Sequence, residues 1–407
     1  MNDNTYASNN GELVLLSTRQ HMGRETAEKI SLLFKTELDW KKIVSIAKRN
    51  KVVHLVYKTM TEHFDGMVDS EDLQALTDES QVHFKSNEDS LDLLLDIKTL
   101  LLSESIPVIF FKGIIFAHVY NKDYKFRTQG DIDILVRPED FLKARDILVR
   151  NGFESVYFGH AEVSTVQAQL GRSDRRASVD LHYGVTPQYQ QTNMDEALSG
   201  SKFDKKYRNK IVKNRTYWFC QFQTEEIWKR KIQIEIEGET ITTLSHEDTL
   251  LVAVIHAAKE NWRSMSRISD ITAIIETSGN LNWEIIYETV SGLGFLKKFY
   301  LGIRLANEMY DVELPVNVIR MMNKHGSKYL ARQIIFRLTL DNFTVDMEEF
   351  RRIVAIMTMD SITDFFRYLQ YVFNTPAGPT GKEITQGNFL GFLKVLSGQY
   401  IRKFLSR

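Results

Sequence analysis

Three aspartates in two short apolar segments of this chain have a spacing that suits a divalent metal ion. Asp131 and Asp133 open one apolar segment, and Asp180 lies between Val179 and Leu181 in another. Side chains alternate along a strand, so Asp131 and Asp133 point to the same face, about 7 Å apart. Carboxylates held side by side repel each other until a cation neutralises them, and Mg²⁺ prefers oxygen ligands. We therefore predict that Asp131, Asp133 and Asp180 bind Mg²⁺ or Mn²⁺.

Such a site suits chemistry at phosphorus. Two metal ions roughly 3.5–4 Å apart can hold both the attacking and the leaving oxygen of an in-line phosphoryl displacement. Asp180 is the natural candidate to lie near an incoming hydroxyl group and to help remove its proton. We therefore expect Asp131, Asp133 and Asp180 to be catalytic as well as metal-binding.

A glycine turn before the first acidic segment predicts a phosphate site. Gly113 stands between an apolar strand (108–111) and an apolar segment that we expect to be a helix. Glycine allows a close backbone approach to a ligand, and the free N–H groups at a helix start favour phosphate. Lys112 would add a point charge to a triphosphate, and Arg127 a two-pronged contact. Lys112, Gly113 and Arg127 are therefore predicted to bind nucleotide.

Acid pairs separated by one residue are common, and a second one lies at Glu235 and Glu237. There the polar residues form one continuous face against Ile232, Ile234 and Ile236, which is typical of a half-solvated hairpin strand. Asp131 and Asp133 differ, because the run that follows them is apolar on both faces. Unpaired charge at the mouth of a buried strand is expensive and usually functional.

Two basic residues further along the chain are candidate nucleotide ligands. His182 shares a strand face with Asp180, so it can contact phosphate or nucleotide, or else make a structural hydrogen bond. His256 and Lys259 fall one turn apart on a predicted helix, and Lys259 is expected to bind nucleotide from a second domain. The alternative is that both simply belong to the core and surface of a packed helix. Asp270 is most simply explained as an ion pair with a nearby arginine.

These motifs together resemble a known family. The segments Phe111-Lys112-Gly113, Arg127, Gly130 to Val136, and Asp180-Leu181-His182 are similar to the bacterial uncharacterised nucleotidyltransferases of the DNA polymerase β-like superfamily. The resemblance spans roughly residues 30–375. It implies nucleotidyl transfer but no particular substrate. We expect the transferred group to be a nucleoside monophosphate, AMP in the first instance, from a nucleoside triphosphate such as ATP. The residue after the glycine departs from the wider superfamily, since Ile114 replaces the usual serine or glycine.

The order of predicted elements indicates an α+β fold. It has a small mixed β-sheet as nucleotidyltransferase core, preceded by N-terminal helices and followed by a C-terminal helical domain. One helix is expected to start at Pro138 and to end near Asn151-Gly152, and Ser245 is expected to be the N-cap of a later helix. We predict a loose N-terminal segment at residues 1–25 and a helical segment at 26–104. The nucleotidyltransferase core follows at 105–244 and the C-terminal helical domain at 245–407. Within the core we expect further strands at 154–158, 162–170 and 178–182, an irregular region at 185–230 and a hairpin at 231–244.

Composition restricts the class of protein. The 407 residues include 52 Lys and Arg against 53 Asp and Glu, a net charge of −1, which gives no overall electrostatic signal for nucleic acid. The single Cys220 excludes an internal disulfide and a cysteine metal cluster. The start of the sequence is polar, with no signal-like apolar region, and no apolar run reaches the roughly 20 residues of a membrane span. We expect a cytoplasmic enzyme.

Three functions stay open at this point. The first is an active nucleotidyltransferase. The second is an inactive relative that serves as a nucleotide-sensing or protein-binding module, which the intact acid triad disfavours. The third is a phosphotransferase or nuclease with the same two-metal chemistry, against which the Lys112-Gly113 turn favours triphosphate binding. The acceptor is not specified by the sequence, because a small molecule, a sugar, a peptide or a protein all fit.

Overall fold

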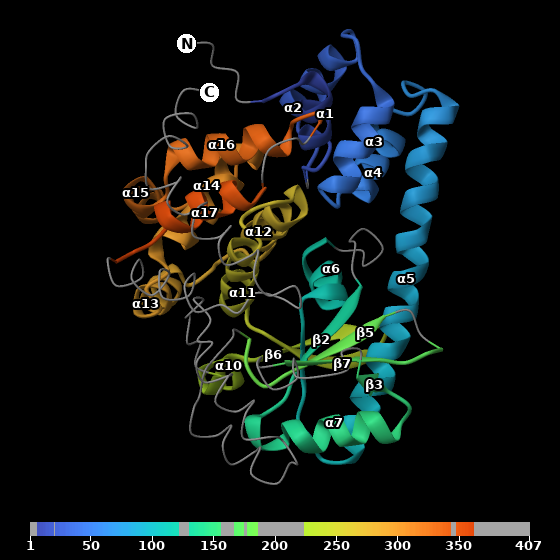
Figure 1. The fold of residues 1–407 in the computed structure, drawn as a ribbon, viewed down its shortest axis with the longest axis vertical. Coiled ribbons are helices and arrows are strands. Elements are labelled where there is room, and N and C mark those ends of the chain that lie inside the picture. Colours follow the sequence, from blue (N-terminus) through green and yellow to red (C-terminus); the bar gives the residue numbers. More distant parts are fainter. Residues whose placement is uncertain are drawn as a thin grey trace, which may run out of the picture.

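The computed structural model describes residues 6–19, 21–121, 130–155, 167–174, 177–185, 224–342 and 347–361. It is an α+β protein, as the sequence predicts, with most helices grouped at one end and a mixed sheet with a few helices at the other (Figure 1). In the described part of the chain, no helix is long and apolar enough to cross a membrane.

The sheet has five strands in the order β1-β2-β5-β4-β3. Their bounds are β1 Ile109–Phe111, β2 Asp131–Leu135, β3 Glu154–Ser155, β4 Gln167–Gly171 and β5 Ser178–His182. Strands β2 and β5 are parallel and every other pair is antiparallel. The two acidic strands are therefore direct neighbours at the centre of the sheet.

The two faces of the sheet carry different side chains, because residues alternate along each strand. Ile132, Ile134, Val179 and Leu181 belong to a buried cluster with the helices α5 (Ser70–Ser103) and α7 (Phe141–Arg150). The opposite face carries the aspartates, and its apolar neighbours belong to the cluster built mainly by the N- and C-terminal helices. The acid row therefore faces the helical part of the molecule.

Local chain signals behave as expected around α7. A short 3₁₀ helix, η2, spans Pro138–Asp140 and leads into α7, which ends at Arg150. Gly152 follows with φ +85°, a backbone conformation that favours glycine. The predicted helix bounds are thus confirmed.

The N-terminal helices are α1 (Asn9–Leu16), α2 (Arg24–Leu33), α3 (Trp40–Arg49) and α4 (Val53–His63), followed by α5. Helix α5 runs along one side of the molecule from these helices to the sheet (Figure 1). Helix α1 differs from the loose segment expected at residues 1–25. Its run of Leu and Val at positions 13–16 is fully buried, and Ser8 caps it by accepting a hydrogen bond from the Gly11 N–H. A helix buried on all sides has no amphipathic period, so its apolar run gave no helical pattern.

After the five-stranded sheet, the described chain continues with α10 (Thr224–Arg230). This helix differs from the irregular region expected at 185–230, of which the structure describes only the two ends. The predicted hairpin is confirmed as β6 (Ile232–Ile236) and β7 (Glu239–Thr243). Ser245 caps the next helix, as predicted, by accepting from the Asp248 N–H. The helices that follow are α11 His246–Lys259, α12 Met265–Thr277, α13 Trp283–Gly292, α14 Leu296–Tyr310, α15 Val316–His325, α16 Lys328–Leu338 and α17 Met347–Met357.

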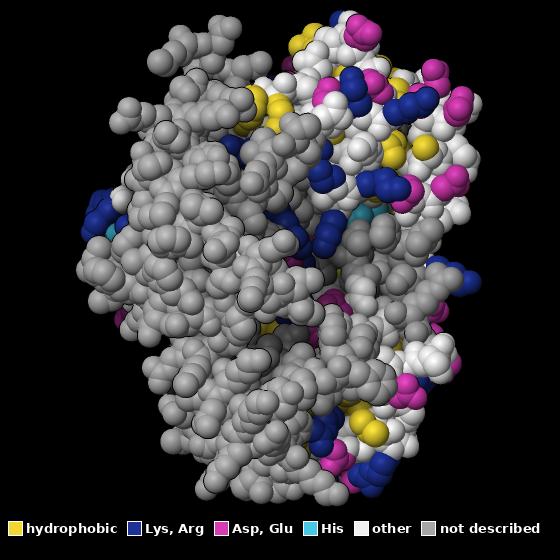
Figure 2. Space-filling view, in the orientation of Figure 1, with side chains coloured by type: hydrophobic (Ala, Val, Ile, Leu, Met, Phe, Trp, Pro, Cys, Tyr) yellow, Lys and Arg dark blue, Asp and Glu magenta, His cyan; other side chains and the backbone are white. Residues whose placement is uncertain are grey.

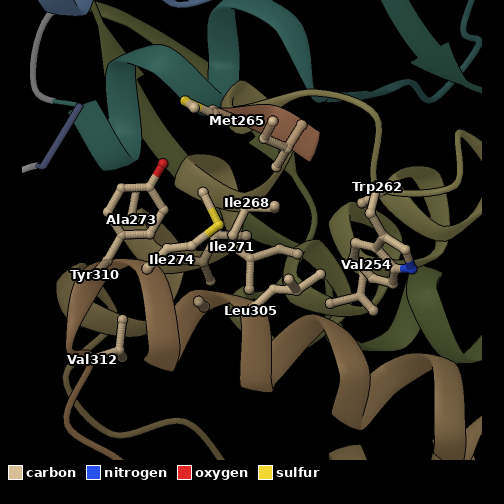
Figure 3. Packing of buried hydrophobic residues seen from close by; sticks show 14 of the residues in the cluster. Val254, Trp262, Met265, Ile268, Ile271, Ala273, Ile274, Leu305, Tyr310 and Val312 are labelled. Atoms are coloured by element: carbon tan, nitrogen blue, oxygen red, sulfur yellow. The ribbon is translucent and has the colours of Figure 1, made fainter. Parts of the chain in front are cut away.

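Helices α11, α12 and α14 form the centre of the C-terminal core (Figure 3). Trp262, in the corner between α11 and α12, is 1% exposed. A Cβ atom added at Gly302 of α14 would lie 2.7 Å from its ring, so the glycine makes room for the indole. The same buried cluster includes residues of α1, α3 and α4. The N-terminal and C-terminal helices therefore share one core, which fixes the position of the two groups of helices relative to each other.

Candidate active site

The strand register brings the predicted aspartates together. Asp133 lies directly opposite Asp180 across the parallel pair β2 and β5, and Asp131 lies opposite Ser178. His182 follows Asp180 by two residues and therefore shares its face. The sheet thus builds one polar row, from Asp131 at its outer end to His182 at its inner end.

Asp133 is the centre of this row. Its side chain is 4% exposed, and its Oδ1 accepts hydrogen bonds from Lys112 Nζ at 2.7 Å and His182 Nε2 at 3.0 Å. Burial opposes ionisation of this carboxyl, but the Lys112 charge and the His182 hydrogen bond outweigh it and hold its pKa well below its ordinary value. Asp133 is therefore ionised throughout the physiological pH range.

The turn from β1 into α6 (Gly113–Asn121) places Lys112 beside Asp133. Lys112 has φ +57° and Gly113 has φ +42°, so two successive residues are left-handed. This conformation is costly for lysine, and such residues cluster at functional sites because their surroundings must hold them there. The Lys112 ammonium lies 4.9 Å from the centre of the Phe111 ring. Helix α6 starts at the turn, directly after Lys112.

Asp180 is the second buried carboxyl, 8% exposed. Burial, and then the negative charges of Asp133 and Asp131, raise its pKa to about 7; Lys112 and a hydrogen bond with Gln169 act in the opposite direction. A carboxyl so destabilised in its charged form is a natural partner for a cation.

His182 is buried, 4% exposed, and its ring meets the edge of Phe111 with 5.3 Å between centroids. Burial lowers its pKa, so the ring is neutral, and donation to the Asp133 carboxylate assigns the proton to Nε2. Nδ1 has no hydrogen-bond partner among the described residues. This position favours the structural hydrogen bond over direct contact with phosphate.

Three side chains in the described part of the chain are close enough to hold one metal ion. One ligand atom each from Asp133, Asp180 and His182 lies within 4.8 Å of the others. Two carboxylates and one imidazole are a suitable donor set for a first-row divalent ion, while Mg²⁺ would use mainly the carboxylates. Asp131, which was predicted as a metal ligand together with Asp133, stands at the outer end of the row and is not in this group. Its charge nevertheless acts on Asp180.

Lys259, the last residue of α11, approaches the row from the helical side. Desolvation and then the charge of Lys112 lower its pKa, and the charges of Glu260, Asp180 and Asp133 oppose the shift. The structure thus brings Lys259 within electrostatic reach of Lys112 and both buried aspartates. Arg127, the other predicted phosphate ligand, lies outside the described residues.

Sequence reasoning missed two groups at the helical edge of the site. Glu260 accepts from His256 Nε2 at 3.1 Å and from Arg267 at 3.3 Å. Arg267 also lies 4.0 Å from Asp270, which agrees with the predicted ion pair. Lys51 follows α3, and the charges of Arg267 and Asp131 both act on its ammonium group. Nothing in the local sequence around Lys51 or Glu260 distinguishes them from ordinary surface residues.

The raised pKa of Asp180 predicts that metal binding depends on pH. Below about pH 7 a divalent ion must displace a proton from this carboxyl, so its affinity falls as pH falls. Asp133 stays ionised and His182 stays neutral between pH 6 and pH 8, because both pKa values are lowered. We expect the affinity for Mn²⁺ to rise by about tenfold from pH 6 to pH 8. Titration calorimetry at the two pH values measures it.

The control for this measurement is Asp180→Asn, which has no proton to lose. Its Mn²⁺ affinity should be weaker and should change little over the same pH range. Equal affinity of the wild-type protein at pH 6 and pH 8 would contradict the assignment of the shifted group.

Most of the chain is similar to one known protein family. A family model described as uncharacterised nucleotidyltransferase matches residues 36–311. The match covers the helices α3 to α5, the whole sheet and the C-terminal helices through α14. No match is found among curated proteins.

Proposed function

The chain belongs to the family of uncharacterised nucleotidyltransferases, and on this premise we propose that it transfers a nucleoside monophosphate from a nucleoside triphosphate to an acceptor. The proposed reaction moves AMP from ATP to a hydroxyl or phosphate group and releases pyrophosphate. The observation that carries the proposal is the buried pair Asp133 and Asp180, opposite each other on parallel strands and beside the Lys112-Gly113 turn.

In this proposal Asp133 and Asp180 hold Mg²⁺ or Mn²⁺, with His182 or Asp131 as the further ligand. The metal supplies neutralisation of charge on the phosphate oxygens. His182 keeps the Asp133 carboxylate oriented through its Nε2–H, as partners behind metal ligands commonly do.

The triphosphate has a natural place at the start of α6. The first N–H groups of the helix, the Gly113 backbone and the Lys112 ammonium converge there, and Lys259 adds a positive charge from α11. Arg127 remains a proposed ligand on the sequence alone. On nucleotide binding Lys112 would exchange part of its contact with Asp133 for phosphate oxygens.

The strand order supports a proposed position for the acceptor. Strand β2 separates β1, which ends at Lys112, from β5, which carries Asp180. In-line displacement needs the attacking and leaving oxygens on opposite sides of the α-phosphorus. With the leaving pyrophosphate near Lys112, the acceptor oxygen approaches from the Asp180 side. A bond forms from that oxygen to phosphorus, the bond to the pyrophosphate oxygen breaks, and the acceptor proton passes to Asp180 or to water.

The test is incubation of the protein with ATP, GTP, CTP or UTP labelled at the α-phosphate, Mg²⁺ or Mn²⁺, and candidate acceptors. Label transferred to an acceptor, with pyrophosphate released, supports the proposal. Thermal unfolding gives a second readout, since a nucleotide that binds the folded state raises its stability by mass action. Nucleotide stabilisation that is the same with and without metal would favour an inactive nucleotide-sensing module instead.

Lys112→Ala tests the placement of the triphosphate. We expect binding of ATP to weaken by about tenfold or more, since charge-assisted hydrogen bonds are worth about 1.5–3 kcal/mol, while binding of AMP changes far less. Calorimetric titration of both nucleotides in the presence of Mg²⁺ measures the difference. Equal losses for ATP and AMP would show that the lysine acts only by stabilising Asp133.

A further inference from the structure

A second group of positive charges lies near Asp131, at the outer end of the acid row. It consists of Lys51, after α3, and of Arg263 and Arg267, around the start of α12. The charges of both arginines and of Asp131 act on the Lys51 ammonium. Figure 2 shows Lys and Arg side chains gathered at the middle of the drawn face, around a hollow with acidic side chains at its edge.

Asn50 holds the α3–α4 corner against α12. Its side chain is fully buried, donates to Leu338 O at 3.0 Å and accepts from the Met265 N–H at 3.2 Å. Its carbonyl accepts from the Ser266 N–H at 3.3 Å. These bonds join elements more than two hundred residues apart. They hold Lys51, the next residue, beside the first turn of α12 that carries Arg267.

The backbone at Lys51 is strained. Its φ of +57° is left-handed, in a helix-ending motif where the Val52 N–H bonds to Ala47 O and the Lys51 N–H to Lys48 O. Glycine is the residue preferred at this position of the motif. Lysine there costs stability, and strain retained against that cost suggests a function for the side chain. Among the described residues, Lys51 forms no salt bridge.

The two arginines are held by Glu260, the residue that follows α11. Glu260 receives Arg263 Nε at 3.4 Å and an Arg267 terminal nitrogen at 3.3 Å. The corner between the helices is rigid, because Asn261 and Trp262 both have φ +55° and the indole is locked against Gly302. The guanidinium groups are therefore positioned before any ligand arrives, which lowers the cost of binding one.

The carboxylates near Lys51, Arg263 and Arg267 determine the net charge of this basic group. Lys51, Arg263 and Arg267 carry three positive charges, and Glu260 and Asp270 supply two negative ones nearby. Asp131 is the remaining negative charge close to Lys51. Asp131 also belongs to the acid row. Without Asp131, the basic group keeps an excess of one positive charge, which an oxyanion can neutralise.

We propose that Lys51, Arg263 and Arg267 form a binding site for a phosphate-class oxyanion at the outer end of the acid row. The inference extends the proposed function, since such a group could belong to a phosphorylated acceptor or to the terminal phosphates of the nucleotide. It assigns the N-terminal helical segment a part in substrate binding, through Lys51. A guanidinium fork and an ammonium are well suited to an oxyanion with several acceptor oxygens.

The decisive variant is Lys51→Gly, tested with inorganic phosphate in the presence of a chelator, so that the metal site is not involved. Glycine adopts the left-handed conformation without strain, so the variant should unfold at a higher temperature than the wild-type protein. It should nevertheless bind phosphate about tenfold more weakly, since one charge-assisted contact is lost. Calorimetry or the phosphate-dependent shift in unfolding temperature measures the affinity.

Two variants complete the design. Lys41→Met removes an exposed lysine at the other end of α3 and should leave phosphate affinity unchanged. Arg263→Gln should weaken phosphate binding as Lys51→Gly does. Unchanged phosphate affinity in Lys51→Gly would overturn the site. Because no nucleotide or metal is present, this result does not depend on whether the protein transfers nucleotides.

A second experiment distinguishes a phosphorylated acceptor from the terminal phosphates of the nucleotide. It measures phosphate binding in the presence of Mg²⁺ and a saturating non-hydrolysable ATP analogue. Phosphate that still binds the wild-type complex, and is lost in Lys51→Gly, assigns the site to a phosphorylated acceptor. If the analogue excludes phosphate, and Lys51→Gly weakens the analogue as much as it weakens phosphate, the site takes the terminal phosphates of the nucleotide. Either result supports an oxyanion site at Lys51.

Discussion

Replacement of Asp133 by asparagine is expected to lower nucleotidyl transfer by about 10³-fold or more and to abolish metal-dependent stabilisation by nucleotide. The change removes the charge at the centre of the acid row, where Lys112 and His182 converge on one oxygen. Charge neutralisation by a bound metal is worth several kcal/mol in a phosphoryl transition state, and each 1.36 kcal/mol is a factor of ten in rate.

The same change should lower the stability of the metal-free protein. The pKa of Asp133 is lowered in the folded state, so its ionised form contributes stability that is present above its unfolded pKa and lost as pH falls below it. Asparagine removes that contribution and leaves a partly buried Lys112 without its anionic partner. Circular dichroism should show a folded protein with a lower unfolding temperature at pH 7.

Asp131→Asn is the matched variant, because it makes the same chemical change two residues away on the same strand face. If the metal is held by Asp133, Asp180 and His182, this variant keeps most of the metal-dependent shift; if Asp131 is the third ligand, it loses the shift. Thermal unfolding with ATP, with and without Mg²⁺, separates the two ligand sets. Retention of the full shift in Asp131→Asn with Asp133→Asn combined would end the metal-site hypothesis.

The acid row could be predicted because it depends on local rules. Period-two alternation places Asp131 and Asp133 on one face wherever their strand lies, and a glycine before an apolar helix marks a turn. The role of His182 depends on more than its own strand. Its ring reaches Asp133 only because β5 pairs in parallel with β2 in one particular register. A shift of that register would send the ring elsewhere, so the sequence left the alternatives open.

The basic group of Lys51, Arg263 and Arg267 could not be predicted from local sequence patterns. Lys51 and Arg267 lie more than two hundred residues apart, and Asn50 joins them through bonds to the start of α12. An asparagine followed by a lysine at a helix end is unremarkable in sequence, because its partners belong to a distant helix. The shared core of N- and C-terminal helices creates the contact, and that core follows from packing rather than from any short motif.

Asp180→Asn is expected to cut turnover by orders of magnitude while nucleotide binding changes little. The proposed contacts to the triphosphate come from Lys112, Gly113 and Lys259, none of which the substitution alters. Asp180 is also a proposed metal ligand, so turnover and nucleotide affinity are compared at Mg²⁺ concentrations that saturate the variant. Its further role is on the acceptor side, where the charge of the attacking oxygen develops in the transition state. A loss in turnover without a loss in nucleotide affinity identifies an interaction made only in the transition state.

The substitution Asp180→Asn should also change the stability of the folded protein, in a direction that a purely structural role of Asp180 would not produce. The pKa of Asp180 is raised to about 7 in the folded protein by burial and by the charges of Asp133 and Asp131. A raised carboxyl pKa means that stability falls as pH rises from the unfolded pKa through about 7. Asparagine removes that penalty, so the metal-free variant should be more stable than the wild-type protein at pH 8, and about equally stable near pH 4.

The two aspartate variants therefore move stability in opposite directions and activity in the same direction. Asp133 stabilises the folded protein through Lys112 and His182, whereas the buried charge of Asp180 destabilises it at high pH. Unfolding temperatures at pH 4 and pH 8, with turnover and ATP affinity for each variant, measure both effects. If Asp180→Asn were less stable at pH 8 and kept near wild-type turnover, Asp180 would be a structural residue, and the acceptor side of the proposed mechanism would have to be withdrawn.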